Sequence, residues 1–101
     1  MQTLAIHTRL KPDRIADYER IHAVIPVELD VALRAAGVTE WKIWRSGQDL
    51  FHWVQVEDVD AMRRSLADAP ADQRWQELIT PLLEPVAGGD ELPLVWELPL
   101  G

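Results

Sequence analysis

Residues 3–22, TLAIHTRLKPDRIADYERIH, contain two hydrophobic periods in succession. From Thr3 to Leu10 apolar residues alternate with other residues, which predicts a strand with two distinct faces. Lys11-Pro12-Asp13 interrupts the alternation and supplies residues that favour a helix start. From about Asp13 to Ala36 apolar residues recur at helical spacing, and we expect a helix over that range.

The remainder of the chain predicts a hairpin, a helical region in two pieces and a closing strand. Ser46-Gly47-Gln48-Asp49 is typical of a hairpin turn, and Pro85–Glu91, which contains Gly88-Gly89, is expected to be a loop. Pro93 and Pro99 flank the closing strand and favour an edge position for it. The elements expected here are strands at Glu40–Trp44 and Leu50–Glu57, helices at Val59–Ala67 and Asp72–Leu83, and a strand at Leu94–Leu98.

The resulting order is β-α-β-β-α-β, the ferredoxin-like plan of the α+β class. We expect a single domain over residues 1–101 with a four-stranded antiparallel sheet and helices on one face only. The other face then needs a cover. A second copy packed sheet to sheet would supply it, so we predict a homodimer of the dimeric α/β-barrel type.

Composition limits the possible partners. The net charge of −7 leaves no basic stripe to neutralise nucleic acid or to attract an anionic membrane surface, so a neutral or cationic ligand is expected. The chain has no Cys, which excludes disulfides and thiolate chemistry. With no signal-like apolar core and no apolar run of membrane-spanning length, the sequence predicts a cytoplasmic protein.

A polar pair interrupts the apolar stripe of the first helix. Tyr18 and His22 are four residues apart and in register with Ile15 and Leu29, so both should point toward the sheet. A neutral imidazole can accept or give a proton near pH 7, and a neighbouring phenol can donate a hydrogen bond. Buried polar groups need partners, which either the fold or a ligand supplies. The pair is therefore either a chemical site or a structural one.

Pro26 favours the chemical interpretation. It has no N–H, so in a continuous helix the carbonyl of His22, four residues earlier, would have no partner. We expect the helix to kink or open there, which makes room for a small molecule beside the histidine.

Residues spread over nearly the whole chain resemble the L-rhamnose mutarotase family. In the first half these are Leu10-Lys11-Pro12, Tyr18, Arg20, His22, Glu28-Leu29, Leu33 and Gly37. In the second half they are Trp41-Lys42-Ile43-Trp44, Leu50-Phe51, Val56-Glu57-Asp58, Gln73-Arg74-Trp75 and Val95-Trp96-Glu97-Leu98.

The resemblance implies a small dimeric enzyme that interconverts the α and β anomers of a pyranose without a cofactor. It implies that His22 transfers a proton, with Tyr18 as its partner at the sugar. Two segments depart from the family. Ala23-Val24-Ile25-Pro26-Val27 stands where Asn-Pro-Ile-Trp-Pro is usual, and Gln76 replaces the second Trp of a Trp-Trp pair. Both changes remove flat aromatic surface that could stack on a sugar, and Gln76 adds a polar group. We therefore expect a neutral deoxyhexose that can differ from the family's usual sugar, with L-fucose as good a candidate as L-rhamnose.

Further residues are candidates for the pocket. Trp75, Gln76, Trp44 and Trp53 are expected to form its wall, and His52 and His7 each sit in a strand pattern from which either could reach it. Asp72 precedes Trp75 closely and is the acidic residue with a possible role there. No spacing of the three His is typical of a zinc site, so we predict no metal.

Two other functions share this fold, because fold alone does not decide activity. One is a cofactor-free monooxygenase acting on an aromatic substrate, and the other is a non-catalytic ligand-binding or dimerisation module. Polar groups around His22 that can bond sugar hydroxyls would favour a sugar substrate. A closed apolar cavity would favour an aromatic substrate, and the absence of a cavity would favour the non-catalytic module.

Overall fold

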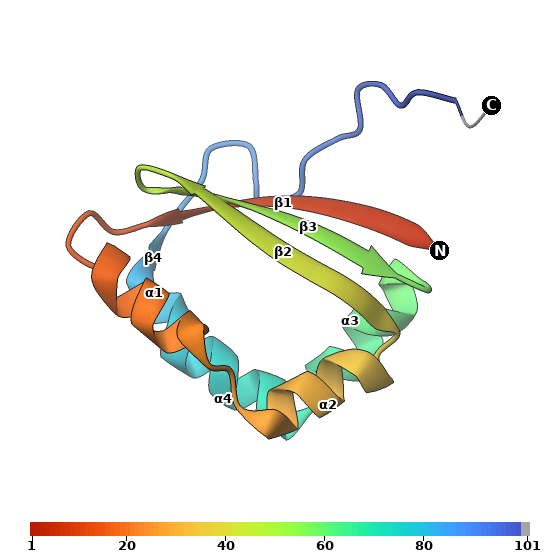
Figure 1. Cartoon of the computed structure of the whole chain (residues 1–101), viewed down its shortest axis with the longest axis horizontal. Coiled ribbons are helices and arrows are strands. Elements are labelled where there is room, and N and C mark those ends of the chain that lie inside the picture. Colours follow the sequence, from red (N-terminus) through yellow and green to blue (C-terminus); the bar gives the residue numbers. More distant parts are fainter. Residues whose placement is uncertain (100–101) are drawn as a thin grey trace.

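The computed structural model describes residues 1–99 and has the predicted order of elements, with the first helical region divided into two helices (Figure 1). The strands are β1 (Gln2–Leu10), β2 (Val38–Ser46), β3 (Asp49–Val56) and β4 (Leu83–Glu84). The helices are α1 (Ile15–Ala23), α2 (Val27–Ala35), α3 (Val59–Ala67), α4 (Pro70–Ile79) and the short 3₁₀ helix η1 (Thr80–Leu82).

The four strands form one antiparallel sheet in the order β2-β3-β1-β4. Figure 1 shows the four α-helices together on one side of this sheet. This is the predicted ferredoxin-like α+β fold. It exposes the opposite sheet face, which carries Trp44 and Phe51 with exposed fractions of 56% and 39%.

The first helical region is not one helix. The prediction of a helix over 13–36 is corrected to two helices separated by residues 24–26, where Val24 is extended (φ −139°, ψ 109°). Pro26 explains the break, since it offers no N–H to α1 and forces its predecessor away from the helical region. The chain changes direction there, so α1 and α2 lie under different parts of the sheet (Figure 1).

The closing strand was predicted in the wrong place. It is Leu83–Glu84, which pairs with Arg9 and Leu10 and directly follows η1. An ion pair between Arg9 Nε and Glu84 Oε1 at 2.8 Å fixes this register. The segment 94–98 has no secondary structure, and its apolar side chains are exposed.

The predicted loop at 85–91 returns the chain to the free edge of β1. There the N–H of His7 donates to the carbonyl of Asp90 at 2.6 Å, and the N–H of Leu92 donates to the carbonyl of Ala5 at 2.9 Å. Beyond these bonds the chain leads away from the sheet (Figure 1). Asp90 is thereby held beside the middle of β1.

The core consists of two separate clusters under the helix-facing side of the sheet. One, around Val54, Val56 and Met62, packs α3 and α2 against the sheet, and the other, around Leu10, Leu50 and Ile79, packs α1 and α4 against it. Among residues 1–99 no helix is long and apolar enough to cross a membrane.

Candidate active site

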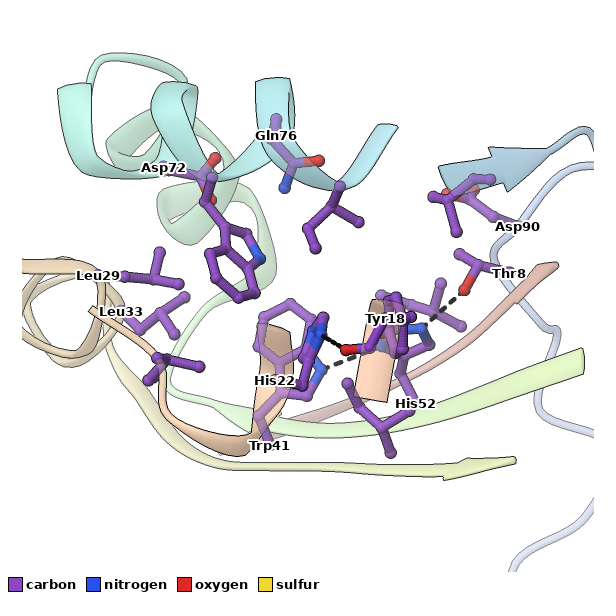
Figure 2. Close-up of a pocket in the computed structure, with 16 residues that line it drawn as sticks. Thr8, Tyr18, His22, Leu29, Leu33, Trp41, His52, Asp72, Gln76 and Asp90 are labelled. Atoms are coloured by element: carbon purple, nitrogen blue, oxygen red, sulfur yellow. Dashed lines mark hydrogen bonds between the residues drawn. The ribbon is translucent and has the colours of Figure 1, made fainter. Parts of the chain in front are cut away.

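A cavity of about 590 Å³ lies on the helix-facing side of the sheet, between α1, α2 and α4 (Figure 2). Its sheet-side lining includes Thr8, Trp41 and His52. These side chains occupy positions of the strand alternation that elsewhere carry the core residues Leu4, Leu10, Leu50, Val54 and Val56. At the middle of the sheet, Thr8, Trp41 and His52 therefore stand at positions where aliphatic core residues would otherwise pack.

Tyr18 holds His22 by two contacts. The Nδ1 of His22 lies 3.2 Å from the backbone carbonyl of Tyr18, and the two rings stack with centroids 3.9 Å apart. A carbonyl can only accept, so Nδ1 carries the proton and the Nε2 of the neutral imidazole keeps its lone pair. The ring lines the cavity, which makes Nε2 the free basic atom of the pair.

Trp75 of α4 contacts the imidazole from another side, edge to face, with centroids 4.9 Å apart and an interplanar angle of 72°. Burial lowers the pKa of His22 below the usual 6.5, and the hydrogen bond to the Tyr18 carbonyl opposes part of that shift. At neutral pH the imidazole is thus uncharged and able to accept a proton.

The Tyr18 side chain is only 5% exposed, and burial raises its pKa to about 12. The phenol therefore stays protonated across the physiological range. It lines the cavity and can offer its hydrogen to a ligand oxygen.

His52 joins two other lining residues by hydrogen bonds (Figure 2). The indole Nε1 of Trp41 donates to His52 Nδ1 at 3.2 Å, and His52 Nε2 lies 2.9 Å from the Thr8 hydroxyl. Burial, with a smaller contribution from the nearby His22, lowers the pKa of His52 to about 4. This imidazole is neutral at pH 7, and both of its nitrogens have protein partners.

The α4 side of the cavity is lined by Trp75 and Gln76, as expected, and by the acidic candidate Asp72. Burial raises the pKa of the Asp72 carboxyl above its usual value, and the hydrogen bond with Gln76 offsets part of that shift. Asp90, from the loop beside β1, also lines the cavity. Among residues 1–99 the carboxyl-bearing lining residues are thus Asp72 and Asp90, and no Lys or Arg lines the cavity.

Two of the expected wall residues lie elsewhere. Trp44 and Trp53 point to the opposite face of the sheet, because β2 and β3 alternate and Trp41 and His52 take the positions that face the helices. Trp53 packs instead under Lys42, whose Nζ lies 5.2 Å from the indole centroid.

His7 also lies away from the cavity. It stacks on Phe51 with centroids 4.9 Å apart, and its Nε2 is 2.8 Å from an oxygen of Asp49. Of the two histidines placed in strand patterns, His52 is therefore the one that reaches the cavity.

Thr8, Trp41 and Asp90 line the cavity but were not among the predicted site residues. Thr8 has a recognisable signal, since it is the polar member of the otherwise apolar alternation Leu4, Ile6, Leu10. No sequence pattern marks Asp90, because a loop brings it to β1 from a distant part of the chain. Among residues 1–99 no group of three His, Cys, Asp or Glu side chains is arranged to hold a metal ion.

Comparisons with known proteins indicate the family of this chain. A sequence model of the L-rhamnose mutarotase family matches residues 3–98. The L-rhamnose mutarotase of Burkholderia orbicola (strain MC0-3) is 32% identical over 96 residues, covering 93% of this chain and 89% of that protein.

Two solved structures share the fold. The L-rhamnose mutarotase of Formosa agariphila superposes with a TM-score of 0.78 at 19% identity, covering 98% of this chain and all of the other. The tetracenomycin F2 cyclase of Streptomyces glaucescens gives a TM-score of 0.66 at 17% identity, with both chains covered completely. At these identities the structures show the fold alone, whereas the sequence matches support an isomerase of the mutarotase type. The chain belongs to the L-rhamnose mutarotase family.

Proposed function

We propose that this protein interconverts the α and β anomers of a neutral deoxyhexose such as L-rhamnose or L-fucose, with His22 as the proton-transfer residue. The observation that carries the proposal is the hydrogen bond from His22 Nδ1 to the Tyr18 carbonyl, which leaves Nε2 as a free base on a ring that lines the cavity.

The proposed reaction needs one proton to move between two oxygens of the sugar. Neutral Nε2 takes the proton from the O1 hydroxyl, and the imidazolium returns it to the ring oxygen as the bond between C1 and that oxygen breaks. The product is the open-chain aldehyde. Rotation about the C1–C2 bond and the reverse steps give the other anomer, with no net change in atoms, charge or oxidation state.

The raised pKa of Tyr18 supports one of two roles for the phenol. Full proton transfer from Tyr18 would leave a buried tyrosinate, which a pKa of about 12 makes costly near pH 7. A hydrogen bond from the phenol to a sugar oxygen has no such cost. We therefore assign both proton transfers to His22 and the orientation of the sugar to Tyr18.

The cavity combines polar groups with a mainly apolar lining. Tyr18, His22, Thr8 and Gln76 supply polar atoms that can match hydroxyl groups, which supports a hydroxylated ligand over a purely aromatic one. Leu29 and Leu33 of α2 add an apolar wall against which the methyl group of a deoxyhexose can pack. The carboxyl groups of Asp72 and Asp90 disfavour phosphorylated or acidic sugars.

Saturation-transfer NMR on unphosphorylated L- and D-sugars tests the proposal. Wild-type protein should accelerate anomer exchange of L-rhamnose or L-fucose. His22→Gln should lose roughly 10²–10⁴-fold of the acceleration, the usual contribution of an acid–base group. Arg64→Gln, at an exposed position of α3 that does not line the cavity, should leave it unchanged. Equal rates for wild type and His22→Gln would exclude His22 as the proton-transfer residue.

We also propose that the protein acts as a homodimer whose two sheets pack face to face. The support is the uncovered outer face with Trp44, Phe51 and Trp53, together with the apolar segment at 94–98, where Val95 is 94% and Trp96 is 71% exposed. Apolar surface of this extent is typical of a protein interface.

A further inference from the structure

We propose that His52 is a positioning residue that turns the Thr8 hydroxyl into a hydrogen-bond donor for a sugar oxygen and fixes Trp41 as a wall of the cavity. This inference rests on the proposed sugar mutarotase function. It adds a polar subsite on the sheet floor of the cavity, formed by Trp41, His52 and Thr8 (Figure 2).

The direction of the hydrogen bonds follows from the donor at one end. An indole N–H can only donate, so His52 Nδ1 must be the unprotonated nitrogen that accepts from Trp41 at 3.2 Å. In a neutral imidazole the proton is then on Nε2. That N–H donates to the Thr8 oxygen at 2.9 Å.

The bond from His52 determines what Thr8 can offer. A hydroxyl group has one hydrogen and two lone pairs, and the imidazole occupies a lone pair. The hydrogen has no other partner among residues 1–99, and Thr8 lines the cavity. Thr8 is thus a donor, while His22 Nε2 is an acceptor, and a sugar that spans both meets two complementary groups.

His52 itself takes no part in proton transfer in this arrangement. Both of its nitrogens are engaged by protein groups, and it is half-buried between β1 and β2 on the helix side of β3. In the register of β1 and β3, His52 is directly opposite Ile6, and Leu50 is directly opposite Thr8. Thr8 and His52 are therefore diagonal neighbours on the same face of the sheet, close enough for their side chains to meet. His52 therefore acts through Thr8 and Trp41.

Kinetics of L-rhamnose anomer exchange test the role of Thr8. Thr8→Val keeps the shape and removes the donor, so we expect KM to rise about 2- to 10-fold, the range for one neutral hydrogen bond. The turnover number should stay within about twofold, because the bond holds the sugar equally in ground and transition states. Thr39→Val, on an exposed part of β2, is the matched control and should match wild type.

Variants of His52 test whether it acts through Thr8. His52→Phe keeps a flat ring without either bond and should raise KM as Thr8→Val does. His52→Gln can still donate to Thr8 and should restore most of the lost affinity. The double variant Thr8→Val/His52→Phe should be no worse than the poorer single variant, since coupled residues are not additive. Additive effects, or His52→Gln no better than His52→Phe, would overturn the inference.

A spectroscopic readout is independent of activity. ¹⁵N NMR at pH 7 should find His52 neutral with the proton on Nε2, and the opposite tautomer would refute the assigned direction of the bonds. If wild type exchanges L-rhamnose but Thr8→Val equals Thr39→Val, the inference alone fails. If wild type neither binds nor exchanges any sugar tested, the proposed function fails and the inference with it.

Discussion

The backbone carbonyl of Tyr18 accepts a hydrogen bond from His22 Nδ1 while the Tyr18 ring stacks on the imidazole, so one residue fixes both the tautomer and the orientation of the other. The carbonyl contact spans four residues within α1. A single helical turn thus orients the proposed base, and α4 adds a further contact through Trp75.

Tyr18→Phe should separate orientation from proton transfer. The ring and its stacking on His22 remain, so we expect a loss of about 2- to 10-fold in kcat/KM, the contribution of a single neutral hydrogen bond. Anomer exchange by saturation-transfer NMR measures this. A loss as large as that of His22→Gln would show instead that the phenol transfers the proton, and unchanged thermal unfolding would verify that the fold is intact.

The pH dependence of exchange should report the lowered pKa of His22. Because burial favours the neutral base, activity should persist as the pH falls through 6.5 and decline only below it. NMR titration of the His22 ring in sugar-free protein gives the same midpoint independently. Trp75→Ala, which uncovers the ring, should move that midpoint back toward 6.5. A wild-type midpoint at or above 6.5 would contradict the burial argument.

Acid should destabilise the fold before its carboxylates titrate. The folded pKa of His52 is about 4 against an ordinary value of 6.5, so between these values the unfolded chain binds more protons. The stability from neutral His52 is complete above the ordinary value and decreases as the pH falls toward 4, with a slope of at most about 1.4 kcal/mol per pH unit for each proton.

Urea unfolding at several pH values between 7 and 4 measures that slope. His22 contributes in the same direction, since its pKa is also lowered. His52→Gln removes one titrating group and should give a shallower decrease than wild type. A parallel decrease in the two proteins would show that other groups cause the acid sensitivity.

Trp44→Glu should disrupt the proposed dimer. The indole is 56% exposed in a single chain, so the change does not disturb the core, but it places a charge in a sheet-to-sheet interface. Sedimentation velocity should find wild type dimeric and the variant monomeric. Val27→Glu, on α2 and 78% exposed, is the control and should remain dimeric. A monomeric wild type would contradict the proposal directly.

Local periodicity predicted most of the elements because their patterns are complete within short segments. The alternation of residues 3–10 and the turn around Gly47 correspond to β1 and to the hairpin of β2 and β3. Pro26 indicated an interruption of the helix, and the chain indeed leaves helical geometry at residues 24–26. These features depend on backbone properties of the residues themselves.

The closing strand could not be predicted in this way. The segment 94–98 has stronger strand character than Leu83–Glu84, yet the latter pairs with β1. Burial of Leu82 in the core and the ion pair between Arg9 and Glu84 select it. The ion pair joins residues 75 positions apart in the chain, and no local pattern contains that information.

The sequence by itself determined the ferredoxin-like order of elements and placed Tyr18 and His22 on one helix face, because hydrophobic period and helical spacing are local properties. Only the tertiary structure decided which face of each strand meets the helices. Apolar residues occupy both faces of β3, so Trp53 and His52 were equal candidates, and packing against the helices selected His52. Strand register then joined His52 to Thr8 and Trp41, since each lies diagonally across from it on a neighbouring strand.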